Sequence, residues 1–115
     1  NKMKALKYIV FFLTLATGYS QNFKDDISVV QFSAPFTKDS EISLKKFRDH
    51  NVYTFYITDK KEIFEKEKIK YLPTIILYHN GDEIMRVESG ISLKLPDDCE
   101  QKILEEIEEI IGNKF

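Results

Sequence analysis

The sequence of 115 residues contains one cysteine, Cys99, and no tryptophan. A single thiol cannot form a disulfide within its own chain, so a disulfide-rich scaffold is excluded. The only two histidines, His50 and His79, lack the close ligand spacing that tetrahedral zinc sites show. We therefore expect no bound metal and no cofactor.

Neither sign of charge is in large excess, because the sequence contains 17 Lys and Arg residues and 19 Asp and Glu residues. Without a basic surplus, the composition argues against a nucleic-acid partner. With only 4 glycines and 3 prolines, the chain contains no glycine-rich phosphate loop and no low-complexity tract. Hydrophobic residues make up 43% of the sequence, which is enough for the core of one small domain.

The N-terminal segment differs in character from the rest of the chain. Three lysines precede an apolar run over residues 8–16, and small residues follow near Ser20. This pattern predicts a secretory signal over residues 1–20 and a domain over residues 21–115, exported to the periplasm or secreted. The run is shorter than the roughly 20 apolar residues that span a bilayer, so membrane contact is expected only through an uncleaved signal. The alternative is a buried first helix or strand.

Regular elements are indicated by the periodicity of the apolar residues. Short β-branched and aromatic runs predict strands over residues 27–32, 52–57 and 74–78. Asn80-Gly81 is a strong hairpin signal and predicts residues 83–87 as the antiparallel partner. We expect helices over residues 39–50 and 60–69, and a last helix that starts near Pro96.

The first two predicted helices have recognisable starts. Thr37 or Asp39 is a suitable cap for the first helix, which should bury Ile42, Leu44 and Phe47. Asp59 with Glu62 forms a pattern like a capping box for the second helix.

The last helix is expected to have one apolar face, capped by Asp97 with Glu100 and ended by Gly112. Its apolar stripe consists of Ile103, Leu104, Ile107, Ile110 and Ile111. The opposite face carries a run of glutamates, which is either a solvated surface or a site for a basic partner.

The predicted order of elements is β-α-β-α-β-β-α. Right-handed crossovers make the first strands parallel and the hairpin antiparallel. The sequence therefore predicts the α/β class, with a mixed central sheet and helices on both of its faces.

Two segments together resemble the two halves of a thioredoxin active site: Ser33 to Ser40, after the first strand, and Lys70 to Gly81. The family has a strand followed by Ala-x-Trp-Cys-Gly-Pro-Cys. Here Phe36 falls on the tryptophan, Thr37 on the first cysteine and Ser40 on the second. The chain is thus similar, over about residues 27–111, to a degenerate thioredoxin-like protein that lacks the Cys-x-x-Cys motif.

The chain departs from the family pattern at the residues that carry out disulfide exchange in the family. Disulfide exchange needs a thiolate nucleophile and a resolving thiol, and the hydroxyls of Thr37 and Ser40 cannot replace them. Gln31 falls where the family commonly has a buried aspartate that handles protons. We therefore expect no catalytic residues and no dithiol-disulfide activity.

The resemblance implies that the binding surface beside the positions of the family cysteines could be kept. In the family, the proline that matches Pro73 is cis and lies beside a groove that pairs with extended peptides. The resemblance implies a cis Leu72–Pro73 bond and a polypeptide-binding site formed by Phe36, Thr37, Leu72, Pro73 and Thr74. The alternatives are that Phe36 and Leu72 only cover the core, or that the protein is a purely structural subunit.

Cys99 supports a further alternative, an oxidoreductase or redox-linked protein that uses one thiol. It is expected in the first turn of the last helix, where the helix dipole lowers a thiol pKa and neighbouring carboxylates raise it. A buried, inert cysteine is the simpler interpretation. Two chains could also form a dimer, linked through Cys99 or associated through residues 1–20.

Overall fold

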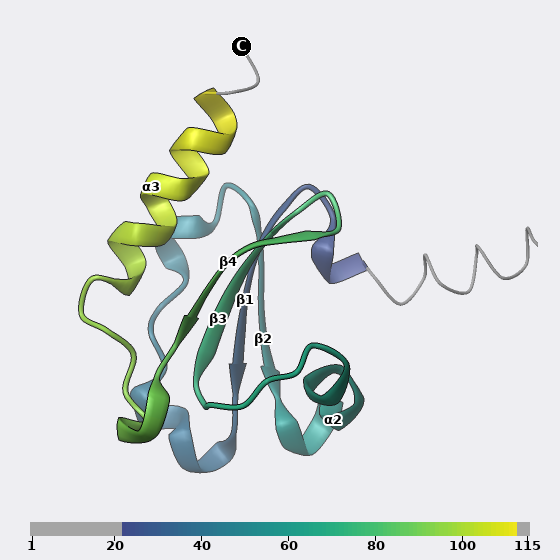
Figure 1. The fold of residues 1–115 in the computed structure, drawn as a ribbon, viewed down its shortest axis with the longest axis vertical. Coiled ribbons are helices and arrows are strands. Elements are labelled where there is room, and N and C mark those ends of the chain that lie inside the picture. Colours follow the sequence, from purple (N-terminus) through teal and green to yellow (C-terminus); the bar gives the residue numbers. More distant parts are fainter. Residues whose placement is uncertain (1–21, 113–115) are drawn as a thin grey trace, which may run out of the picture.

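The computed structural model describes residues 22–112, and the signal predicted over residues 1–20 lies outside them. The described chain forms a mixed sheet with helices on both faces (Figure 1), which confirms the predicted fold class. The strands are β1 (Ile27–Ser33), β2 (Asn51–Tyr56), β3 (Thr74–His79) and β4 (Asp82–Glu88).

The strand order in the sheet is β2-β1-β3-β4. β1 and β2 run parallel, and β3 and β4 form an antiparallel hairpin, as predicted. β3 is also antiparallel to β1, so β1–β2 is the one parallel pair within residues 22–112. The hairpin turn uses left-handed backbone at Asn80 (φ 49°) and Gly81 (φ 93°), which explains the Asn-Gly sequence.

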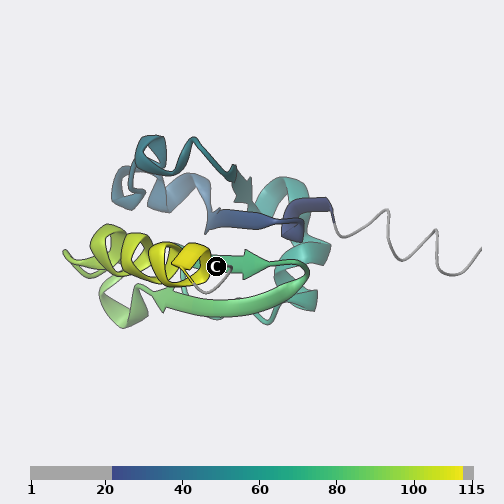
Figure 2. The same ribbon diagram turned by 90° about the horizontal axis from the view of Figure 1, so that it is seen from above.

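The two long helices, α2 (Ile57–Lys66) and α3 (Cys99–Gly112), lie toward opposite sides of the sheet, as the view from above shows (Figure 2). β1 lies between them and is buried along its whole length. One core, on the α3 side, contains Val29, Ile75, Leu77, Ile103 and Ile107. The other, on the α2 side, contains Val30, Phe32, Phe64, Ile76 and Tyr78.

The helix predicted over residues 39–50 is wrong. The structure has two short 3-10 segments instead, Pro35–Ser40 and Lys45–Phe47, with extended backbone at Glu41 (φ −69°, ψ 151°). Thr37 lies inside the first segment and therefore does not cap a helix at this point. Phe47 is buried, and Ile42 and Leu44 pack against the same core, so the predicted inward face is kept.

A contact between residues far apart in the sequence explains why residues 39–50 do not form a helix. The Gln31 side chain accepts a hydrogen bond from the Ile42 N–H at 2.9 Å and donates one to the Ile42 carbonyl at 3.1 Å. Both peptide groups of Ile42 are thus taken by the sheet and cannot serve a helical ladder.

α2 begins and ends three residues earlier than predicted. It starts at Ile57, and the residue before it, Tyr56, makes no side-chain capping bond. Asp59 lies in the first turn, so the predicted capping box is wrong. The backbone at Lys60 is not helical (φ −130°, ψ 40°), and this residue marks a kink between a short first turn and the rest of the helix.

α3 agrees better with its sequence pattern. Ile103 and Ile107 are buried, and Leu104 and Ile110 pack partly against the same core. Ile111 is exposed, so the predicted stripe is shorter by one residue. None of the described helices is long and apolar enough to cross a membrane.

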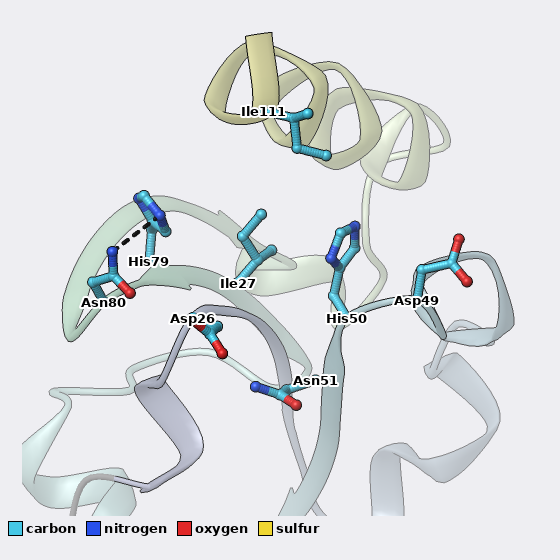
Figure 3. Close-up of a pocket in the computed structure, with 8 residues that line it drawn as sticks. All are labelled: Asp26, Ile27, Asp49, His50, Asn51, His79, Asn80 and Ile111. Atoms are coloured by element: carbon cyan, nitrogen blue, oxygen red, sulfur yellow. Dashed lines mark hydrogen bonds between the residues drawn. The ribbon is translucent and has the colours of Figure 1, made fainter. Parts of the chain in front are cut away.

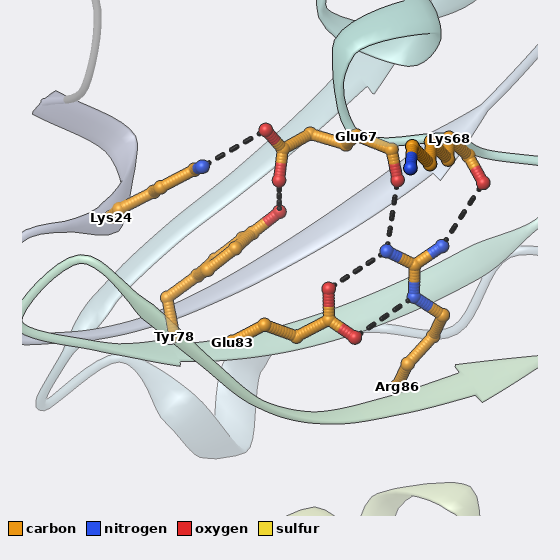
Figure 4. A network of polar contacts seen from close by, with 6 residues as sticks. All are labelled: Lys24, Glu67, Lys68, Tyr78, Glu83 and Arg86. Atoms are coloured by element: carbon orange, nitrogen blue, oxygen red, sulfur yellow. Dashed lines mark hydrogen bonds and ion pairs between the residues drawn. The ribbon is translucent and has the colours of Figure 1, made fainter.

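A polar network closes the core on the α2 side (Figure 4). The Glu67 carboxylate accepts a hydrogen bond from the Tyr78 hydroxyl at 2.7 Å and pairs with the Lys24 Nζ at 2.9 Å. Arg86 donates to the backbone carbonyls of Glu67 and Lys68 at 2.9 and 3.2 Å. Burial, with help from Glu67, raises the pKa of Tyr78 far above its usual range. The end of α2 is thereby tied to the start of the fold and to the hairpin.

Candidate functional site

Three connections meet at one end of the sheet. The register pairs Phe32 with Thr74 and Thr74 with Glu88, so the residues after β1, before β3 and after β4 lie side by side. The Ser89 N–H donates to the Pro73 carbonyl at 3.2 Å. The Leu72–Pro73 bond is cis, as the resemblance implies. The two motif halves are therefore neighbours in space.

Thr37, at the position of the first family cysteine, is buried, with 2% of its surface exposed. Its Oγ1 accepts a hydrogen bond from the Ala34 N–H at 3.1 Å and donates to the Ala34 carbonyl at 3.2 Å. The Ser33 hydroxyl lies 3.1 Å from the same oxygen. A hydroxyl with these partners holds the loop in place and is not presented to a substrate. Ser40, at the second cysteine position, is partly buried.

A hydrogen-bonded chain continues from Thr37 to residues that the sequence did not single out. The Ser33 hydroxyl donates to the Glu41 carboxylate at 2.8 Å. A hydrogen bond to Glu41, aided by its negative charge, raises the pKa of Tyr56. Ser33 and Tyr56 are register partners on β1 and β2, which is a contact between strands that no local pattern reveals.

The two histidines lie at the other end of the sheet. His50 and His79 line a cavity of about 390 Å³, with Ile27 between them (Figure 3). The Nε2 of His79 is 3.2 Å from the Asn80 amide nitrogen. Neither histidine is placed to activate Thr37, and no group of three or more metal-ligating side chains occurs within residues 22–112.

Cys99 is buried at the start of α3, with 1% of its surface exposed. Burial, together with the charges of Asp98 and Glu100, raises the pKa of this thiol to about 11. A buried, protonated thiol is neither a nucleophile at neutral pH nor open to a second chain.

Exposed apolar side chains gather around the end of the sheet where the motif halves meet. Phe36 is 73% exposed and Ile91 is 94% exposed, and they follow β1 and β4 respectively. Tyr71, before β3, and Leu93, after β4, are also exposed. We call Phe36, Tyr71, Ile91 and Leu93 the apolar rim.

Of the predicted binding residues, Phe36 is the one whose side chain is exposed to solvent. Leu72 is half-buried against the core on the α2 side, and Pro73 and Thr74 are buried. The Thr74 hydroxyl donates to the Tyr71 carbonyl at 2.6 Å and so holds the segment that leads into β3. Sequence reasoning missed Ile91, although Gly90 beside it, with left-handed backbone (φ 71°), marks the turn that presents it.

Comparisons with known proteins agree with this geometry. No family model and no curated sequence matches the chain. Among solved structures, thioredoxin NaTrxh from Nicotiana alata is 22% identical, with a TM-score of 0.59 over 81% of this chain and 83% of that one. A thioredoxin from Malassezia sympodialis is 19% identical, with a TM-score of 0.58 over 74% of this chain and 80% of that one.

The chain has a thioredoxin-like fold. The oxidised thioredoxin from Plasmodium falciparum, 19% identical, also matches, with a TM-score of 0.54 over 74% of this chain and 84% of that one. This thioredoxin-like chain has a single cysteine, and that cysteine is buried at the start of α3. The chain therefore shares the fold of the thioredoxins but has no pair of cysteines.

Proposed function

We propose that this protein is a redox-inactive thioredoxin-like protein that binds a polypeptide at the apolar rim. The observation that carries the proposal is the contrast between Phe36 and its neighbour Thr37: the ring is exposed and the hydroxyl is buried. At the position of the family nucleophile the side chain points into the fold, while the adjacent aromatic side chain is left facing solvent.

The chemistry supports redox inactivity. Disulfide exchange proceeds through a thiolate and a mixed disulfide that a second thiol resolves. This chain has one thiol, and its pKa is raised to about 11. The buried amide of Gln31 is engaged with Ile42 and carries no exchangeable acid proton for such a reaction.

The surface supports peptide binding. Large apolar side chains that gather at one exposed site often mark a partner surface. Beside Tyr71 lies a depression lined by Lys68, Lys70, Arg86 and Glu88. A peptide with an apolar anchor and an acidic flank would fit this combination of an apolar rim and a mostly basic depression.

The redox part is tested by a disulfide-reduction assay on insulin with dithiothreitol as the electron source. The wild-type chain should give no turnover above the blank. A Thr37→Cys/Ser40→Cys variant restores the family spacing and serves as the positive comparison. Wild-type turnover that disappears in Cys99→Ala would show the proposal to be wrong.

The binding part is tested on a synthetic peptide array. Peptides selected by the wild-type protein should bind Phe36→Ala and Ile91→Asp at least tenfold more weakly, which corresponds to about 1.4 kcal/mol each. Ile84→Asp is the matched control, because Ile84 is exposed on β4 away from the rim. Leu72 is a poor test position because it is half-buried. Binding that is unchanged in both rim variants would refute the assignment.

We also propose that the protein is exported, on the strength of the pattern in residues 1–20. Edman sequencing of the chain recovered from cells that make it should give Gln21 as the first residue. A chain that retains residues 1–20 and stays with the cytoplasmic fraction would contradict this.

A further inference from the structure

The two edges of the sheet are built differently. β4 has charged side chains at Asp82, Glu83, Arg86 and Glu88, and its pairing with β3 shifts register at Leu77/Tyr78. Charges and bulges are the usual devices that stop an edge strand from pairing with another chain.

β2 forms the opposite edge (Figure 1) and has none of these devices. Its sequence, Asn-Val-Tyr-Thr-Phe-Tyr, contains no charge, no proline and no glycine. These residues have high β-propensity, and such an uncharged edge is a template for strand addition. Within residues 22–112, β1 is the only strand that pairs with it.

We propose that β2 pairs antiparallel with β2 of a second copy of this chain, about a two-fold axis at Thr54. The product is a closed dimer with one continuous sheet of two four-stranded halves. Only the two charged β4 edges remain at its margins, so the assembly does not extend further.

The register follows from the alternation of the side chains. Tyr53 and Phe55 pack on the α2 side, and Val52 packs on the α3 side. A two-fold axis normal to the sheet pairs residues whose side chains point to the same face. One residue of the strand must therefore lie at the axis, directly opposite its own copy in the partner. With the axis at Thr54, Tyr53 lies opposite the partner's Phe55.

The same register makes the other pairs favourable. Val52 lies opposite the partner's Tyr56, and Thr54 opposite the partner's Thr54. Aromatic, aromatic with β-branched, and Thr-Thr pairs are the cross-strand combinations that stabilise antiparallel strands. Moving the axis to Tyr53 would instead place Asn51 opposite the partner's Phe55. The register centred on Thr54 therefore pairs all residues from Val52 to Tyr56 in favourable combinations.

On the α2 side of the sheet, the aromatic side chains of β2 already form a row that a second β2 strand would continue. Tyr53 and Phe55 stack with ring centroids 5.7 Å apart, and Phe55 meets Phe32 edge-on at 6.0 Å. Pairing would continue this row of rings across the axis. Thr54, at the centre, is exposed and can accept a substitution without disturbing either core.

The oligomeric state of the full chain tests the proposal. Sedimentation velocity over a dilution series should give twice the mass of one chain for the wild type. Thr54→Lys should sediment as a monomer, and Ile84→Lys, the same change on the β4 edge, should remain a dimer. Circular dichroism and the melting temperature show whether each variant is folded. A monomeric wild type, or a dimer that survives in Thr54→Lys, would overturn the proposal.

A cross-link tests the register independently of the mass measurement. Directly opposite residues in antiparallel strands have Cα atoms about 4.5 to 5.5 Å apart, which is within disulfide range. In a Cys99→Ala background, Thr54→Cys should therefore give a linked dimer on mild oxidation, whereas Ile84→Cys should not. Linkage of Thr54→Cys no greater than that of Ile84→Cys would reject the register.

Discussion

Gln31 shows how one side chain can replace a chemical function with a structural one. The resemblance places it where the family commonly has a proton-handling aspartate. In this chain its amide holds both peptide groups of Ile42, eleven residues later in the sequence. The sequence revealed that the acid is absent, but the new partner could not be predicted, because it depends on where the loop returns to the sheet.

We expect Gln31→Leu to destabilise the fold by about 1 to 3 kcal/mol, since it leaves the partly buried polar groups of Ile42 without partners. Urea unfolding followed by circular dichroism measures this loss. Gln101→Leu, on the exposed face of α3, is the matched control and should change stability by less than about 0.5 kcal/mol. Equal effects would mean that the Gln31 contact is not structural.

Cys99 gives a prediction with a definite sign. Its folded pKa, about 11, lies above the value of about 8.5 for a free thiol. Below about pH 8.5 both states hold the proton, and the thiol adds no pH dependence. Between that pH and about 11, the unfolded chain releases the proton while the folded chain keeps it, so stability falls as pH rises.

The measurement compares the wild type with Cys99→Ala over this range. The difference in unfolding free energy should shrink as pH rises, and subtraction removes the contribution of tyrosines such as Tyr78. An aromatic disulfide reagent should also label the native thiol far more slowly than the unfolded one. Rapid native labelling at neutral pH would contradict burial of Cys99.

At the scale of elements, sequence patterns predicted the strands well because their apolar runs are short, β-branched and bounded by polar residues. They failed over residues 39–50, where helical spacing of apolar residues was present but the peptide groups were already engaged. The start of α2 was also misplaced, because Asp59 has a capping sequence and yet lies inside the first turn. Side-chain spacing reports burial, whereas backbone partners decide the element.

The junction of α2 with the hairpin depends on Glu67. We expect Glu67→Ala to cost about 1 to 3 kcal/mol, because it removes the partner of the buried Tyr78 hydroxyl and of the Lys24 ammonium. Glu100→Ala is the control: its ion pair with Lys46 is at least as short, 2.7 Å, but lies on the surface and is worth about 0 to 1 kcal/mol. Thermal unfolding of the two variants should separate a buried pair from an exposed one.

At the scale of the whole molecule, the alternation of elements was enough to predict a mixed sheet with helices on both faces. It did not predict that β3 would run antiparallel to β1. Nor could it show which apolar residues would be left exposed, since Ile91 belongs to a turn with no periodicity. The candidate site was predicted from motif positions, and its exposed surface emerged only with the arrangement of the loops.

The proposed rim and the proposed dimer edge occupy different parts of the molecule. The rim lies at the end of the sheet after β1 and β4, whereas the dimer would form along the side of β2. We therefore expect Thr54→Lys to bind array-selected peptides with the affinity of the wild type, within about twofold or 0.4 kcal/mol. A large loss of binding in that monomer would mean that the two surfaces are coupled.

The central position of β1 has a consequence for how the chain acquires its structure. Its neighbours in the sheet come later in the sequence, and one of its pairs joins Ile27 to His79. Contacts between such distant residues must be reached by a search that slows folding. During synthesis, the strand that is buried along its whole length in the fold therefore emerges first, and it stays without its β3 neighbour until His79 has been made. Until then, this strand is exposed to contacts with other chains that lead to aggregation.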